Sequence, residues 1–498
     1  MSPLTKMKLP CRFIFFTICL CALSMNTCAS SIGSHYKNVP SPVLERSLDS
    51  TMELVQNVAS AMSNIHMYAD PDVDADAGED DDRNLKIAIL HCGYVLGSTY
   101  EAMNWSLSTI HQDYKQYKGK GDVISHARTR LNANLERQKT CVEAFDGTKY
   151  SMITQSFKQV RSSTQDLLKM LQAKPGRIEA KAGLEFWKTP NVTVSQDGSG
   201  NFRTITEALA VAPSHNQNYF VIFVKRGVYK ENVNIDSSKC NLVLIGEGMD
   251  VTTISGSRSF RSGWETFYSA TFAVSADGFI AMDIGFENTA GPENYQAVAL
   301  LSGGDRAVFY RCKISGYQDT LLVHAGRQFF RECQISGSLD FIFGYGAAVF
   351  QKCLLTVKKT IPGVINTVTA HGRYAPNDPT GFSFQFCTIS ADSDVAAAYL
   401  GRPWGKYSRT VFMQSYISNV IQPQGWIEWK GTSALNTLYY GEYTNNGPGA
   451  RLSSRVNWPG YHVIENPAEA DEFTTAKFIE GDSWLTSTNV PFIRGLED

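Results

Sequence analysis

The sequence lacks an excess of charge of either sign, and it lacks a long apolar run after its first residues. Its 46 Lys and Arg balance 48 Asp and Glu, which gives a formal net charge of −2. No broad basic surface therefore favours nucleic acid as a partner. The one apolar run, at residues 13–25, is short for a membrane span, and no other stretch could cross a bilayer. We expect neither nucleic-acid binding nor a stable membrane association once the amino-terminal segment is removed.

Two patterns that often carry chemistry are also missing. No Cys-x-x-Cys motif and no His/Cys pair occurs at the spacing of zinc ligands. No Gly-x-Ser-x-Gly elbow is present, and the histidines after residue 190 have no evident nucleophile partner. We therefore expect no metal, no cofactor and no serine-hydrolase mechanism.

The amino terminus has the features of a secretory signal. Lys6, Lys8 and Arg12 precede the apolar run, and small residues follow it at 28–31. We predict a signal peptide at residues 1–30, with an uncleaved anchor as the alternative, and an extracellular, secreted protein. The glycosylation sequons at Asn104 and Asn191 are consistent with export.

Secretion permits disulfides among the cysteines that follow the signal. Their number is odd, so at least one should be unpaired, and the sequence does not give the connectivity. They are Cys92, Cys141, Cys240, Cys312, Cys333, Cys353 and Cys387.

Residues 32–172 have the pattern of an all-α helical bundle. Apolar residues recur at helical spacing from Leu85 to Leu96 and from Ile124 to Val142. Because Cys92 and Cys141 fall in different predicted helices, a disulfide that joins two helices is plausible. We expect a solvated acidic loop at 70–82 and a linker at 173–190. The bundle could be an inhibitory pro-region, a folding aid or a spacer.

Residues 191–498 have short β runs bounded by Gly, Asn and Asp. A short sequence motif recurs with a period of about 20 residues. It appears first as Phe309-Tyr-Arg-Cys312-Lys-Ile-Ser315 and then as Phe330-Arg-Glu-Cys333-Gln-Ile-Ser336. Weaker copies begin at Phe350, Phe384 and Phe412. A β-rich repeat of this period predicts the stacked coils of a right-handed parallel β-helix.

The two ends of the repeat differ from its middle. A short amphipathic helix at 204–212 is expected to cap the open end of the solenoid, because an exposed strand edge invites unwanted pairing. After Thr432 the repeat is no longer visible, and we expect the chain to pack back along the outside.

Two aspartates occur at the same offset in adjacent repeats. Asp319 follows Cys312 by seven residues, and Asp340 follows Cys333 by seven. Equivalent positions in adjacent coils lie one strand spacing apart, roughly 5 Å. Two carboxylates that close do not both ionise easily, so one tends to keep its proton while the other is a charged nucleophile or base. The alternative is a pair of solvated residues that cap turns.

Six blocks of residues 190–498 resemble the plant pectin methylesterases, in the right order and at family-like spacing. The helical half, around Cys92 and from Asp122 to Gly147, is less distinctly similar to the inhibitor-like pro-region that precedes many of these enzymes. The blocks are Asp197-Gly-Ser-Gly-Asn-Phe202, Gly227-Val-Tyr-Lys-Glu231, Gln296-Ala-Val-Ala-Leu300, Gly316-Tyr-Gln-Asp-Thr-Leu321, Asp340-Phe-Ile-Phe-Gly344 and Leu400-Gly-Arg-Pro-Trp404.

The resemblance implies a mainly β protein, with a right-handed parallel β-helix catalytic domain at 191–498 preceded by an inhibitor-like bundle at 32–172. It implies hydrolysis of galacturonate methyl esters in cell-wall pectin, with release of methanol. Asp340 would be the nucleophile and Asp319 the general acid and then base. Gln296 and Gln318 would stabilise the oxyanion, and Arg402 would orient Asp340 and keep it ionised.

The resemblance also implies the substrate contacts and the partners. Trp404 would be a platform on which a sugar stacks, and Gln296, Thr271, Phe343 and Arg402 would contact the substrate as well. The expected partners are methyl-esterified homogalacturonan and either the protein's own pro-region or a separate inhibitor bundle. Without the resemblance, the glutamines could be rungs of a polar ladder, Trp404 a packed loop residue and Arg402 the partner of a loop carboxylate.

Several positions depart from the family pattern. Leu301, Leu322 and Tyr345 stand where the family usually has Arg, Tyr and Asn, and the segment between Asp394 and Tyr399 is several residues short. In the bundle, a Cys pair expected within residues 32–91 is missing, and the linker lacks the basic doublet that usually marks a processing site. These departures concern groove shape and processing more than the presumed catalytic residues.

The departures keep a second hypothesis open, a catalytically weakened pectin-binding protein of the same fold. A third is a β-helix lyase or glycosidase, because fold alone does not determine function. A lyase would create unsaturated chain ends and a glycosidase new reducing ends, whereas an esterase shortens nothing.

Overall fold

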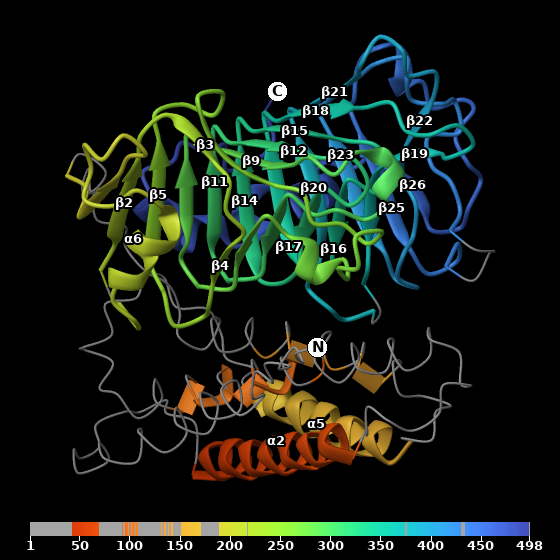
Figure 1. The fold of residues 1–498 in the computed structure, drawn as a ribbon. Coiled ribbons are helices and arrows are strands. Elements are labelled where there is room, and N and C mark those ends of the chain that lie inside the picture. Colours follow the sequence, from red (N-terminus) through yellow and green to blue (C-terminus); the bar gives the residue numbers. More distant parts are fainter. Residues whose placement is uncertain are drawn as a thin grey trace, which may run out of the picture. The chain divides into compact units, whose positions relative to one another are not determined.

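The computed structural model describes residues 42–68, 151–170 and 189–497, with gaps at 217, 374–375 and 430–433, and separate helical positions between 92 and 142. These residues fall into two compact units, one that holds the long helices and one that holds the strands (Figure 1). The predicted signal peptide, the acidic loop and most of the predicted linker lie outside the described residues.

The helical unit contains two long helices that pack against each other, α2 (Pro42–Tyr68) and α5 (Ser151–Met170). Each helix buries apolar side chains, Val55 in α2 and Phe157 and Val160 in α5. Since residues three or four apart on a helix share a face, burying one such face stabilises both helices. The structure confirms the prediction of helices in this part of the chain.

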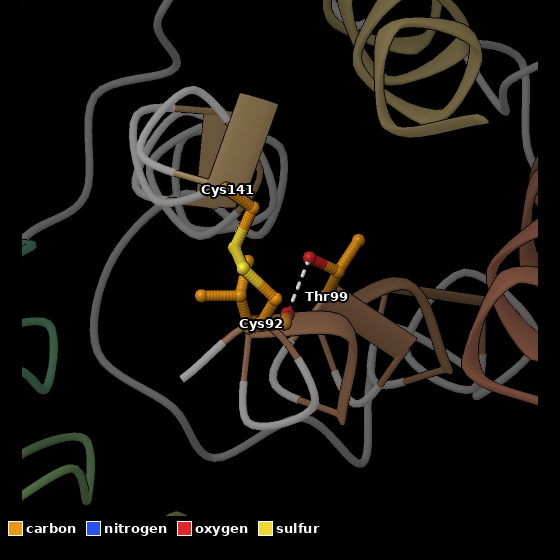
Figure 2. Close-up of a disulfide and its surroundings, with 4 residues drawn as sticks. Cys92, Thr99 and Cys141 are labelled. Atoms are coloured by element: carbon orange, nitrogen blue, oxygen red, sulfur yellow. Dashed lines mark hydrogen bonds between the residues drawn. A yellow bond between two sulfur atoms is a disulfide. The ribbon is translucent and has the colours of Figure 1, made fainter. Parts of the chain in front are cut away.

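The predicted link between two helices is confirmed. Cys92 and Cys141, both at helical positions, form a disulfide with Cα atoms 5.4 Å apart (Figure 2). Close to it, Thr99 Oγ1 donates a hydrogen bond of 2.8 Å to the carbonyl of Val95. Of the helix faces inferred from spacing, Leu131 is buried. The predicted positions at 85, 89 and 124 lie outside the described residues.

The strands of the second unit form three sheets, and all the neighbouring strands described in them are parallel. The eleven-stranded sheet contains β1 (Val192–Val194), β2 (Phe220–Val224), β5 (Leu242–Gly246), β8 (Ile280–Met282), β11 (Ala307–Tyr310), β14 (Arg327–Arg331), β17 (Ala347–Gln351), β20 (Gly381–Gln385), β23 (Arg409–Met413), β25 (Tyr439–Tyr443) and β26 (Tyr461–Val463). The eight-stranded sheet contains β3 (Gly227–Tyr229), β6 (Thr252–Gly256), β9 (Gly285–Asn288), β12 (Lys313–Ser315), β15 (Gln334–Gly337), β18 (Leu354–Val357), β21 (Thr388–Ala391) and β24 (Tyr416–Ile417). The seven-stranded sheet contains β4 (Val233–Ile235), β7 (Phe272–Val274), β10 (Leu300–Ser302), β13 (Leu321–Val323), β16 (Ile342–Gly344), β19 (Asn366–His371) and β22 (Ala398–Gly401).

From β2 to β25 consecutive strands belong to different sheets, so each complete turn of the chain contributes one strand to each sheet (Figure 1). The strands β11, β12 and β13, for example, make one coil, and β14, β15 and β16 make the next. This arrangement is a parallel β-helix, as the repeat predicted.

One residue in the left-handed conformation makes the corner between the eleven-stranded and the eight-stranded sheet. The φ angles are 50° at Arg311, 53° at Glu332 and 55° at Lys352. Each of these residues directly precedes a cysteine of the repeat, and the cysteine side chain is buried inside the corner. A small side chain that behaves as an apolar group fits there, which explains why the repeat specifies cysteine. Cys312, Cys333, Cys353 and Cys387 are free thiols.

The aromatic residue of the repeat forms a column through the interior. Neighbouring rings have centroids between 4.4 and 4.8 Å apart and lie within 12° of parallel. The strand register places these residues opposite one another, so the same sequence position recurs at the same place in each coil. The column consists of Phe309, Phe330, Phe350, Phe384 and Phe412.

A short helix, α6 (Ile205–Val211), packs on the first strands and confirms the predicted cap. Its first turn is held by a capping box, in which Thr204 and Glu207 bond to each other's backbone N–H groups. The carboxylate of Glu231 also accepts from the N–H groups of Ile205 and Thr206, at 2.9 and 3.0 Å. The helix is therefore fixed by charge and hydrogen bonds at its amino-terminal end.

The expectation that the chain after Thr432 packs back along the outside was wrong for its first part, because two further strands extend the eleven-stranded sheet. Strand β25 pairs with β23, and β26 pairs with β25. Their repeats lack the Cys of the earlier coils, so the sequence pattern does not reveal them. Short helical segments follow or interrupt these last coils: η4 (Pro448–Ala450), α7 (Pro467–Asp471), α8 (Thr475–Phe478), η5 (Gly481–Ser483) and η6 (Leu485–Ser487).

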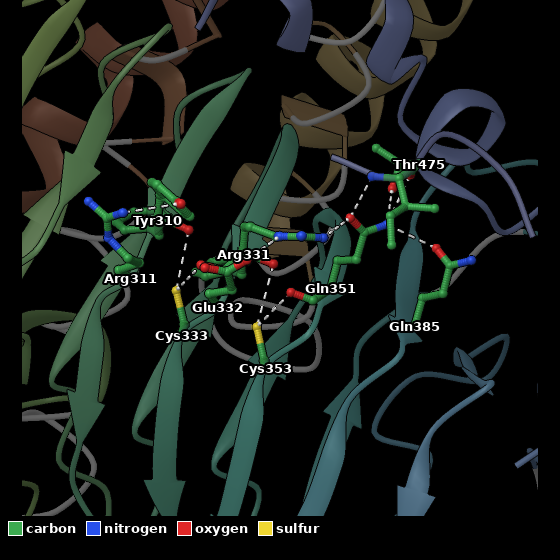
Figure 3. Close-up of polar contacts among 12 residues, drawn as sticks. Tyr310, Arg311, Arg331, Glu332, Cys333, Gln351, Cys353, Gln385 and Thr475 are labelled. Atoms are coloured by element: carbon green, nitrogen blue, oxygen red, sulfur yellow. Dashed lines mark hydrogen bonds and ion pairs between the residues drawn. The ribbon is translucent and has the colours of Figure 1, made fainter. Parts of the chain in front are cut away.

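The carboxyl-terminal segment packs along the outer face of the eleven-stranded sheet, as predicted, and Gln351 is a central point of attachment (Figure 3). Its Oε1 accepts from Arg331 Nη1 at 2.6 Å and from the N–H of Ile493 at 2.8 Å. Its Nε2 donates to Gln385 Oε1 at 3.0 Å and to Thr475 Oγ1 at 3.2 Å. The polar side chains on this face of the sheet therefore find hydrogen-bond partners in the carboxyl-terminal segment that covers them.

Replacing Phe350 by Ala should lower the free energy of unfolding by about 3–5 kcal/mol, because its ring is fully buried between two neighbours of the column. Denaturant unfolding of the whole protein measures the loss. Phe260→Ala is the control, because that ring is 55% exposed and its removal should change stability by less than about 0.5 kcal/mol. Similar losses in the two variants would contradict the role of the column.

Candidate active site

Asp319 and Asp340 occupy the same place in two adjacent coils. Each lies two residues before a residue of the seven-stranded sheet, Leu321 and Ile342, and these two residues are paired in the ladder. The N–H of Asp319 also donates to the carbonyl of Leu339, at 3.0 Å. Because adjacent strands are about 4.8 Å apart, the two aspartates are neighbours. The register expected from the repeat is correct.

The backbone has the same unusual conformation at both aspartates. Their φ angles are 61° and 50°, in the left-handed region that Asp tolerates better than most residues. The side chains are only 8% and 4% exposed. The two carboxylates therefore leave equivalent turns at equivalent points, and both are largely removed from water.

Asp340 forms an ion pair with Arg402. Arg402 Nη2 lies 2.6 Å from Oδ2, and Nε lies 2.9 Å from Oδ1 and 3.1 Å from Oδ2. The guanidinium also lies 4.0 Å above the ring of Trp429. A charge-assisted contact with both oxygens favours the ionised carboxylate and fixes its orientation.

A threonine that the sequence analysis missed also contacts Asp340. Thr367 Oγ1 donates to Oδ1 of Asp340 at 2.5 Å and accepts from the N–H of Asp340 at 2.9 Å. Thr367 lies in β19, at the position equivalent to Asp340 in the next coil. The offset of seven residues after Cys353 points instead to Thr360. Counting seven residues after the cysteine does not find the equivalent position in this coil, because the loop at 358–365 lengthens it.

Asp319 has a different environment from Asp340. Within the described part of the chain, no group donates a hydrogen bond to its carboxyl oxygens. Burial raises the pKa of Asp319 well above its usual range, and repulsion from Asp340 adds to the increase, while Arg402 opposes it. Asp319 therefore tends to keep its proton under conditions in which Asp340 is ionised and paired.

Gln296 and Gln318 lie close together in adjacent coils. Gln318 directly precedes Asp319, and its carbonyl accepts from the N–H of Ala297, which follows Gln296, at 3.1 Å. The Gln296 carbonyl accepts from the N–H of Phe260 at 2.8 Å, so a neighbouring loop holds this backbone. Among the described residues, none is hydrogen-bonded to either side-chain amide. Both amides are half-buried and retain their donors.

The residues expected to bind substrate differ in accessibility. The half-buried Trp404 ring packs against Tyr345, with centroids 4.7 Å apart, and against Phe343 at 6.0 Å. Phe343 is buried beneath it. Thr271 is fully buried, so the structure does not bring its side chain to a surface where a ligand could reach it.

Two of the positions that depart from the expected pattern, Leu301 and Leu322, lie in one apolar row. Leu301 pairs with Leu322, and Leu322 pairs with Phe343, along the seven-stranded sheet. Trp404 and Trp429 pack on this row, together with Phe267 of the short helix η2 (Phe267–Ser269). Trp429 was not identified from the sequence, because it lies outside the six motif blocks.

The described residues offer neither a metal cluster nor a membrane span. They contain no group of three or more His, Cys, Asp or Glu side chains placed to hold a metal ion. None of their helices is both long enough and apolar enough to cross a membrane.

The fold and the site together define a β-helix protein with a buried pair of aspartates, one of which is paired with an arginine. Residues 191–482 match the family model described as pectinesterase. Residues 17–172 match the model described as plant invertase/pectin methylesterase inhibitor. The chain belongs to the pectinesterase family and is an ester hydrolase with an inhibitor-type amino-terminal region.

Individual proteins agree with this assignment. A pectinesterase/pectinesterase inhibitor of Prunus persica is 48% identical over 469 residues, which cover 90% of this chain and 88% of that protein. The pectin methylesterase from carrot is 49% identical, with a TM-score of 0.61 over 62% of this chain and 98% of that one. A pectin methylesterase from Aspergillus niger is 32% identical, with a TM-score of 0.53 over 61% of this chain and 98% of that one.

Asp319→Asn should make stability less dependent on pH. A carboxyl whose pKa is raised by folding contributes stability that is present below its unfolded pKa, about 3.9, and is lost as pH rises through the folded value. Asn cannot ionise, so the variant should gain stability relative to the natural protein as pH rises above about 4. The gain is about 1.4 kcal/mol for each unit by which folding raises the pKa.

Unfolding free energies of both proteins between pH 4 and 8 measure this difference. Asp340→Asn is a second comparison: it weakens the contact with Arg402, which should destabilise the protein by about 1.5–3 kcal/mol, and it removes the charge that helps to raise the pKa of Asp319. A constant difference between Asp319→Asn and the natural protein across this range would contradict the raised pKa.

Proposed function

We propose that this protein is a pectin methylesterase that hydrolyses the methyl esters of galacturonate residues in pectin, with Asp340 as the nucleophile. The observation that carries the proposal is the asymmetry of the aspartate pair. Asp340 is held as a carboxylate by Arg402, whereas burial and the neighbouring charge favour the protonated form of Asp319. One group is therefore ready to attack and the other ready to give a proton.

In the first step, a carboxylate oxygen of Asp340 attacks the carbonyl carbon of the ester, and the carbonyl π electrons move onto its oxygen. The side-chain amides of Gln296 and Gln318 donate to this oxyanion. Collapse of the intermediate breaks the bond to the methoxy group, which takes the proton of Asp319 and leaves as methanol. An anhydride then joins Asp340 to the sugar.

In the second step, water attacks the anhydride and Asp319, now ionised, accepts the proton of that water. The bond to Asp340 breaks and leaves a galacturonic acid group, which releases the second proton of the water to solvent and becomes a carboxylate. Asp319 is protonated again and Asp340 is ionised again, so the cycle closes without a cofactor. Trp404 offers a ring on which a sugar of the chain stacks.

The same proposal includes location and partners. The protein would be exported by the signal at residues 1–30 and act in the cell wall. Its inhibitor-type region would either bind the protein's own catalytic unit or remain apart from it until the region is removed. The family assignment leaves no support for a lyase or a glycosidase.

Asp340→Asn should lower the rate of methanol release from highly methylated pectin by at least about 10³-fold, because an amide is a poor nucleophile. Methanol is measured for the full chain and for residues 189–498, since the inhibitor-type region could suppress the full chain. The carrot structure aligned over 62% of this chain supports testing that segment alone. Near-ultraviolet circular dichroism confirms that each protein is folded.

The results separate the hypotheses. Release by the natural protein and none by the variant would support the carboxylate mechanism. Equal release by both would exclude Asp340 as the nucleophile. No release by either folded protein, with pectin still bound, would favour the catalytically weakened binding protein.

One observation favours that second candidate. Tyr345, which stands where the family usually has Asn, packs its ring against Trp404 at 4.7 Å. The platform proposed for a sugar is therefore partly covered by the protein's own side chain. Tyr345→Asn would raise turnover if this contact restricts the substrate.

A further inference from the structure

We propose that Thr367 is a positioning residue that fixes the Asp340 carboxylate and leaves its Oδ2 atom as the one that attacks the ester. This inference rests on the function proposed above. Thr367 does not belong to the six blocks that carry the family resemblance, and no role follows for it from the sequence. Its case depends on two hydrogen bonds to a single residue.

The direction of these hydrogen bonds is settled by the chemistry of the groups. The N–H of Asp340 can only donate, so the Thr367 oxygen must accept at 2.9 Å. A hydroxyl has one proton, which remains available for the second contact. The carboxylate oxygen Oδ1 can only accept, so this proton lies between Thr367 Oγ1 and Oδ1, across 2.5 Å. Short bonds from hydroxyl to carboxylate are among the strong ones.

The same contacts distinguish the two oxygens of Asp340. An ionised carboxylate has about two acceptor sites on each oxygen. Oδ1 accepts from Thr367 and from Arg402 Nε at 2.9 Å, so both of its sites are occupied. Oδ2 accepts from Arg402 Nη2 at 2.6 Å and shares the Nε proton only at 3.1 Å. Oδ2 therefore keeps a lone pair that can form the bond to the ester carbon.

The backbone contact has a separate effect. Asp340 has a φ of 50°, a conformation that costs energy for a residue with a side chain. Its N–H donates to the Thr367 side chain. Thr367 itself is held in the ladder, because its N–H donates to the carbonyl of Ser338 at 3.1 Å. One buried hydroxyl thus ties both the turn and the carboxylate of Asp340 to the next coil.

The test compares Thr367→Val, Thr367→Ser and the matched control Thr369→Val in the full chain. Val keeps the shape and removes the hydroxyl, and Ser keeps the hydroxyl. Thr369 lies on the same strand and is equally buried, but its hydroxyl donates to the carbonyl of Leu400 at 2.9 Å. Both Val variants lose one buried hydroxyl, and only one of these hydroxyls contacts Asp340.

Thr367→Val should lower kcat for methanol release by about 10- to 100-fold with KM changed less than about twofold, because a bond to the charged nucleophile is lost. The acid limb of the pH dependence of kcat/KM should move to higher pH, because the Asp340 carboxylate loses the hydrogen bond that the Thr367 hydroxyl donates. Thr367→Ser should recover kcat to within about threefold of the natural protein. Thr369→Val should keep both kcat, within about twofold, and the position of the acid limb.

Asp340→Asn and the natural protein are assayed in parallel, so that the two proposals can fail separately. An active natural protein in which Thr367→Val and Thr369→Val have the same kcat and the same pH profile would overturn the role of Thr367 alone. A natural protein that is folded but releases no methanol, as full chain and as residues 189–498, would overturn both proposals. If Thr367→Val does not fold, Thr367→Ala and Thr369→Ala, which also remove one buried hydroxyl each, provide the same comparison.

Discussion

The register between parallel coils is the constraint on which the rest of the structure depends. In a parallel ladder each residue lies beside its equivalent in the next coil, about 4.8 Å away. The same rule builds the interior column that includes Phe350, the inner corners filled by cysteine and the pair of aspartates. A slip by one residue would exchange interior and exterior side chains along a whole strand, so the apolar interior fixes the register of the site as well.

Register alone would give the two carboxylates equivalent environments. The proposed reaction requires different ones, because one carboxylate attacks and the other donates a proton. The difference comes from Arg402, which lies two coils after Asp340 and contacts both of its oxygens. Asp319 has no such partner among the described residues and is buried beside a negative charge, which raises its pKa. A repetitive scaffold thus gains an asymmetric site through side chains of the following coils, Arg402 and Thr367, which contact Asp340.

The face that carries the aspartates also carries this chain's own features. Leu301 and Leu322 continue the apolar row of Phe343, and Tyr345 packs on Trp404. These side chains surround the reacting groups without replacing them. Under the proposed function, variation of this kind would affect which sugars fit beside the aspartates, whereas the ion pair and the register are set by the coils beneath.

The sequence by itself determined the β-helix and the pairing of Asp319 with Asp340, because a periodic pattern carries its own register. It made a disulfide between Cys92 and Cys141 plausible, and the structure supplied the connectivity. The family motifs added Arg402. Only the tertiary structure decided where the period breaks. It placed Thr367 rather than Thr360 beside Asp340, because the loop at 358–365 lengthens one coil by an amount that no local pattern reveals. It also buried Thr271 and added coils after Thr432, since burial and strand pairing depend on neighbours distant in the chain.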